Sequence, residues 1–99
     1  MSEPTVEVTP ALMERYIALT LAAREKATPL HPSDSVEGQR LVTMMEMADA
    51  YASDAAWFVE KGDLVRAFGA INYAHAWIDC AVKIGLLDGH GDDAMFTLP

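Results

Sequence analysis

Apolar positions recur at helical spacing in three segments of the chain. In the first, steps of four, three and four residues predict an amphipathic helix from Thr9 to about Ala27. Thr9 suits the N-cap, and Pro10 suits the first turn, where its missing N–H is not needed. The repeating positions are Leu12, Tyr16, Leu19 and Ala23.

In two further segments the apolar residues follow one another at intervals of three, four, three, four and three residues without a break. This spacing is typical of helices in left-handed bundles. Asp34 and Glu37 suit a capping box that opens the second helix. Gly62 is expected to take a left-handed conformation between the second helix and the third, which Asp63 caps. The second seam is Leu41, Met44, Ala48, Tyr51, Ala55 and Phe58, and the third is Leu64, Ala67, Ile71, Ala74, Ile78 and Ala81.

The sequence contains no long alternation of apolar and polar residues of the kind that predicts a β-strand. We therefore predict an all-α fold, an antiparallel up-down-up three-helix bundle, over residues 9–88. Residues 1–8 lack a period and are expected to form a flexible N-terminal arm. Residues 89–99 form a C-terminal tail that begins with turn residues and becomes apolar again at its end, which suits a segment that folds back.

Four stretches resemble an archaeal family, the domain of unknown function 357: residues 51–58, residues 60–63, residues 67–79 and residues 85–88. The most specific piece is Ile71-Asn72-Tyr73-Ala74-His75 and on to Asp79, because helical periodicity alone does not require it. The resemblance is strong over residues 45–88. It implies a spectrin-like three-helix fold, and the family name carries no assigned activity.

Composition narrows the function classes. A chain of 99 residues with 52% apolar content is compatible with one folded domain and not with a disordered linker. Its net charge of −8 disfavours nonspecific binding to nucleic acids and to anionic membranes. No apolar run is long enough for a membrane span, and the first residues do not look like a signal peptide. The single cysteine, Cys80, fits a reducing cytoplasm, where we expect the protein to reside.

Asn72, His75 and Asp79 fall on one side of the predicted third helix, and Asp54 on the second helix is a further candidate. A carboxylate four residues from an imidazole can orient it, as a general base or a metal ligand requires. The same spacing also describes a solvated helix face, so both interpretations stay open. Two ligands do not make a metal site, and no hydrolase or phosphate-loop motif occurs, so we expect neither metal nor cofactor.

The apolar surface of the third helix is larger than two partner helices require, since its apolar arc spans about 240°. We expect either the tail or a second copy of the chain to cover the part beyond the seam. On the second helix, Trp57 lies among acids; residues 34–63 hold seven acids and two bases, a net charge of −5 that suits a basic protein partner. The predicted interface residues are Gly69, Tyr73, Ala76, Trp77, Cys80 and Trp57.

These observations favour a non-enzymatic protein-interaction or assembly module. The alternative is a ligand-binding or hydrolytic helical domain that uses the Asn72, His75 and Asp79 cluster.

Overall fold

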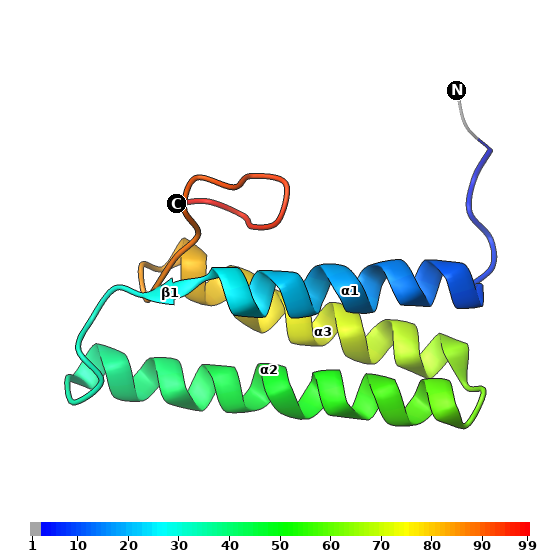
Figure 1. The fold of residues 1–99 in the computed structure, drawn as a ribbon, viewed down its shortest axis with the longest axis horizontal. Coiled ribbons are helices and arrows are strands. Elements are labelled where there is room, and N and C mark those ends of the chain that lie inside the picture. The colour runs from blue at the N-terminus through cyan, green and yellow to red at the C-terminus, as the bar shows by residue number, and fades with distance from the viewer. Residues whose placement is uncertain (1–2) are drawn as a thin grey trace.

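The computed structural model describes residues 3–99 and confirms the three-helix bundle. Its elements are α1 (Pro10–Lys26), β1 (Thr28–Pro29), α2 (Val36–Glu60), α3 (Leu64–Lys83) and β2 (Leu87–Asp88). Helix α2 runs antiparallel to α1, and α3 runs back beside both (Figure 1). The two short strands pair antiparallel, with Thr28 opposite Asp88. No helix in residues 3–99 is both long and apolar enough to cross a membrane.

Side chains cap the beginning of each helix. The Thr9 hydroxyl accepts the N–H of Leu12 at 3.1 Å, as the sequence predicts. Helix α2 is capped by Ser35 and not by Asp34, because the Ser35 hydroxyl accepts the N–H of Gly38 at 3.0 Å and donates to a preceding carbonyl. The predicted capping box is therefore wrong: the N-cap is one residue later, and its third helical residue, Gly38, has no side chain to complete a box.

Two glycines end the longer helices. Gly62 has a φ of +76°, and the next residue, Asp63, donates its N–H to the carbonyl of Phe58 at 2.9 Å. Gly85 repeats this arrangement at the end of α3 with a φ of +82°, and the following Leu86 is buried. Both ends are Schellman motifs, in which glycine takes the left-handed backbone that other residues avoid. The prediction for Gly62 is confirmed.

Helix α3 is the central element of the bundle. It packs against both α1 and α2, whereas α1 and α2 touch each other little. The molecule is correspondingly flat, 43 × 33 × 16 Å along its principal axes. Five of the six predicted seam positions of α3 are buried, and Leu64 at the first turn is partly buried. The buried five are Ala67, Ile71, Ala74, Ile78 and Ala81.

The predicted seam of α1 is partly right. Ala23 is buried and Leu12 and Tyr16 are partly buried, whereas Leu19 is exposed; the other buried side chains of the helix are Met13 and Thr20. Helix α1 has apolar residues of its own on more than one side, so its sequence contains two apolar stripes with helical spacing. Periodicity alone does not determine which stripe faces the core. In α2 the same ambiguity places Met45 deeper than the predicted Met44. Contact with α3 decides which stripe is buried.

The C-terminal tail folds back over α1 and α3, as the red end of the ribbon shows (Figure 1). Phe96, near its end, is only 3% exposed and joins the core cluster that contains Ala23 and Ile78. Gly89 makes this approach possible, because a Cβ at that position would lie 2.9 Å from the Phe96 ring. The tail therefore completes one part of the hydrophobic core.

Candidate functional site

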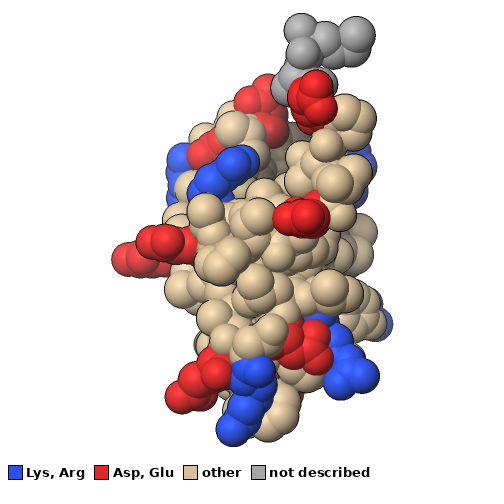
Figure 2. Space-filling view, turned by 90° about the vertical axis from the view of Figure 1, so that its right-hand side faces the viewer, with Lys and Arg blue, Asp and Glu red and all other residues tan. Residues whose placement is uncertain are grey.

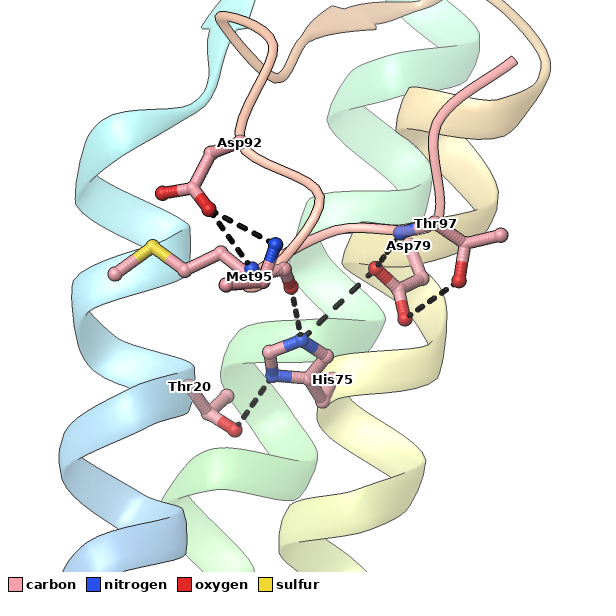
Figure 3. Close-up of polar contacts among 7 residues, drawn as sticks. Thr20, His75, Asp79, Asp92, Met95 and Thr97 are labelled. Atoms are coloured by element: carbon pink, nitrogen blue, oxygen red, sulfur yellow. Dashed lines mark hydrogen bonds and ion pairs between the residues drawn. The ribbon is translucent and has the colours of Figure 1, made fainter.

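The His75 side chain lies at the junction of α1, α3 and the tail (Figure 3). Its Nδ1 is 3.0 Å from the Thr20 hydroxyl, and its Nε2 is 2.8 Å from the carbonyl oxygen of Met95. A carbonyl only accepts, so Nε2 carries the hydrogen, and in the neutral ring Nδ1 accepts from Thr20. Both ring nitrogens are thus occupied by protein atoms, and neither is free to act as a base or to bind a metal ion.

Asp79 binds the tail one helical turn further along α3. Its carboxylate accepts the backbone N–H of Thr97 at 2.9 Å and lies 3.9 Å from Nε2 of His75 (Figure 3). Lys83, on the same side of the helix, donates to the carbonyl of Leu98 at 2.9 Å. This side of α3 is neither a solvated face nor an open site; it holds the folded-back tail.

The other two candidates do not join this group. The Asn72 side chain donates to the carbonyl of Phe68 in its own helix at 2.9 Å. Asp54 lines a separate hollow between α2 and α3, together with Tyr51 and Tyr73. Within residues 3–99 no three acidic, histidine or cysteine side chains come together in a way that could hold a metal ion. Only His75 and Asp79 of the predicted cluster meet.

We expect Thr20→Val to lower the free energy of unfolding by about 1–3 kcal/mol, because it leaves His75 Nδ1 without a partner in a mostly buried position. Urea unfolding measures the change. Ser53→Ala, at an exposed position of α2, is the control and should change stability little. Equal stability of Thr20→Val and the wild type would contradict the assigned hydrogen bond.

A second histidine contact lies where the tail begins, and the sequence pattern missed it. His90 Nε2 is 2.9 Å from the Thr28 hydroxyl, and His90 Nδ1 is 3.7 Å from a carboxylate oxygen of Asp88. The order of hydroxyl, imidazole and carboxylate resembles a hydrolase triad. However, 3.7 Å is too long for a hydrogen bond, and all three groups are exposed to solvent. The contact joins the tail to the strand ribbon.

An ion pair supports the same junction. Lys26 at the end of α1 donates to Asp92 at 2.7 Å. This hydrogen bond, helped by the N–H of Met95, holds the pKa of the Asp92 carboxyl below its ordinary value. A lowered pKa means that the contact stabilises the fold above the ordinary pKa of an aspartate and is lost as the pH falls through the lowered value.

The predicted interface residues lie on another side of α3. Gly69, Tyr73, Ala76 and Cys80 are exposed, and Trp77 is partly buried. Two shallow hollows of about 390 and 230 Å³ share Tyr73 and have mainly apolar walls. The tail lies over His75 and Asp79 instead, so it does not cover these residues within one chain.

Trp57, the remaining predicted interface residue, is exposed on α2. Lys61 lies over its ring, with the ammonium 5.4 Å from the ring centroid. At the end of the bundle where α2 meets α3, Lys and Arg side chains lie beside Asp and Glu (Figure 2). The acids of α2 therefore do not form a purely negative surface patch at this end of the bundle.

Comparison with known proteins gives one match. A family model described as "Protein of unknown function (DUF357)" matches residues 15–87. This segment includes most of α1, both other helices and the first residue of β2. No curated protein and no solved structure matches the chain.

Proposed function

The chain belongs to the DUF357 family, whose description assigns no activity, and on that premise we propose that it is a non-enzymatic assembly module that pairs with a second copy of itself through α3. A cytoplasmic location is part of this proposal and rests on the single cysteine. The archaeal origin and the boundaries at residues 8 and 88 stay predictions.

One observation carries the proposal: six apolar or small residues form an exposed stripe along the outward side of α3, flanked by the charged side chains of Arg66 and Lys83. Val65 is 73% exposed, Tyr73 47% and Ile84 61%, on the side opposite the buried seam. With Gly69, Ala76 and Cys80 between them, these residues follow steps of four, four, three, four and four. A contiguous exposed apolar stripe of this kind is typical of a surface that a partner covers. The spacing is the one by which helices pack against each other.

The charges near this side favour a second copy over a charged partner. Asp79 is the only acid of α3, and the tail already occupies its carboxylate. Beside the hollow at Tyr73 lie one acid, Asp54 of α2, and one base, Arg66 of α3, so the charges there balance and do not select a charged partner. A symmetric pair places this apolar side against itself, as two-fold interfaces do. Gly69 has no side chain, and the space beside it is open, since no atom lies within 4 Å of the position a Cβ would take; a second helix can therefore approach its backbone.

A basic protein partner on α2 is less well supported. Such a partner would place a cation on the exposed Trp57 ring, which is the favourable position for a cation beside an aromatic group. The ammonium of Lys61 already lies over that ring. The catalytic alternative is weaker still, since His75 has no free nitrogen. Self-assembly through α3 is the function that the surface supports best.

Ala76→Arg should convert a dimer into a monomer, because a long cation does not fit a close contact between helices. Light scattering after size-exclusion chromatography measures the mass. Ala50→Arg, which places the same side chain at an exposed position of α2, is the control and should remain dimeric. In the wild type a short bismaleimide should also link two chains through Cys80, and Cys80→Ser should abolish the link.

A wild-type chain that remains monomeric at the concentrations used for NMR would contradict the proposal. So would an Ala76→Arg variant that keeps the mass of a dimer and a native circular dichroism spectrum.

A further inference from the structure

The groove between α1 and α2 contains a hollow that the proposed assembly does not use. It lies at the β1 end of the bundle and has a volume of about 300 Å³. Buried side chains of Leu41, Met45 and Leu87 line it, and Val42 forms a half-exposed wall. The volume lies at the lower end of the range of small-molecule sites, about 300–1,000 Å³, so the hollow suits a small ligand such as a short alkyl chain.

Three charged side chains line the same hollow, and two of them neutralise each other. Arg24 donates to both carboxylate oxygens of Asp49, at 2.8 and 3.2 Å. Glu46 is the third, and among residues 3–99 its carboxylate has neither an ion pair nor a hydrogen bond. One arginine against two carboxylates leaves a net charge of −1 beside apolar walls.

We propose that this hollow binds a small primary amine with an apolar body, the alkyl chain against Leu41 and Met45 and the ammonium on Glu46. Burial of the ligand's alkyl chain against the apolar walls stabilises the complex, and the unpaired Glu46 carboxylate favours a positively charged head group. A fatty acid of the same length would have to displace Asp49 from Arg24 and would face a net negative rim. The inference concerns a different face from α3 and does not depend on self-assembly.

Three ligands with the same carbon chain separate these contributions: hexylamine, 1-hexanol and hexanoate. In a ¹H–¹⁵N NMR titration of the full chain, hexylamine should give saturable shifts at Ala27, Val42 and Leu87. It should bind roughly two- to fivefold more tightly than hexanol, which is the factor that one exposed ion pair supplies. Hexanoate should bind more weakly than either.

Variants of the protein test which residue binds the ammonium group and whether the ligand lies in the hollow. Glu46→Gln should reduce the affinity for hexylamine to that for hexanol, whereas Asp54→Asn, in the other groove of α2, should not change it. Val42→Phe fills the hollow from a half-exposed position and should abolish the binding of all three ligands.

Equal affinities for hexylamine and hexanol in the wild type would overturn the proposal, as would unchanged hexylamine binding by Glu46→Gln. A capped lysine, Nα-acetyl-lysine methylamide, tests for a protein source of the same amine. If this compound binds more tightly than hexylamine, the proposal of a small amine is overturned and the ligand of the hollow is a lysine side chain of a partner protein.

Discussion

Ile78→Ala is expected to lower the free energy of unfolding by about 2–5 kcal/mol, a large share of the stability of a domain of this size. Ile78 is 1% exposed and lies in the C-terminal half of α3. It belongs to the core cluster that also contains Ala23 of α1, Met45 of α2 and Phe96 of the tail, so its truncation leaves a cavity in the cluster that joins the helices to the tail. Chemical denaturation followed by circular dichroism measures the loss.

Val36→Ala is the matched control, because it removes apolar atoms from an exposed β-branched residue in the first turn of α2. Its effect should stay within about 0.5 kcal/mol. If Ile78→Ala unfolds at the same denaturant concentration as the control, α3 is not the central helix of the bundle.

Phe96→Ala is expected to lower the free energy of unfolding by about 3–5 kcal/mol, the range for a buried aromatic side chain. This is unusual for a residue in an irregular tail, and the reason is its burial to 3% exposure in the main core cluster. The variant should also melt at a lower temperature and bind a hydrophobic dye, because the apolar surface beneath the ring becomes accessible.

Asp93→Ala tests the same segment without touching the core, since Asp93 is exposed. It should melt within a few degrees of the wild type. A Phe96→Ala variant as stable as Asp93→Ala would mean that the tail is not part of the folded core.

The tail, residues 89–99, lies outside the residues that the family model matches, yet it is held by side chains within them. The family match ends at residue 87, whereas the partners of His75 and Asp79 are Met95 and Thr97. The family match thus supplies the two anchoring side chains on α3 but not the segment that they hold. These polar contacts occupy one side of α3 and the core occupies another, so the side of α3 that carries Tyr73 and Cys80 is the one that stays exposed.

Local chemistry determined much of this fold. Thr9, Gly62 and Asp63 act at helix ends through hydrogen bonds and backbone angles that involve only neighbouring residues, so sequence reasoning placed them correctly. The seam of α3 was also predictable, because polar residues leave it one deeply buried stripe. The family resemblance is confirmed as well, and the matched residues, 15–87, extend into α1, beyond the residues 45–88 on which the resemblance rested.

Tertiary packing decided the rest. Helix α1 has two stripes of apolar residues, and only contact with α3 selects Met13 over Leu19. The spacing of His75 and Asp79 indicated that they share a side of the helix, yet their partners are Thr20, 55 residues away from His75 in sequence, and Thr97. Periodicity describes which residues share a face of one helix. Which segment then covers that face depends on contacts between residues far apart in the chain, and helical spacing does not encode them.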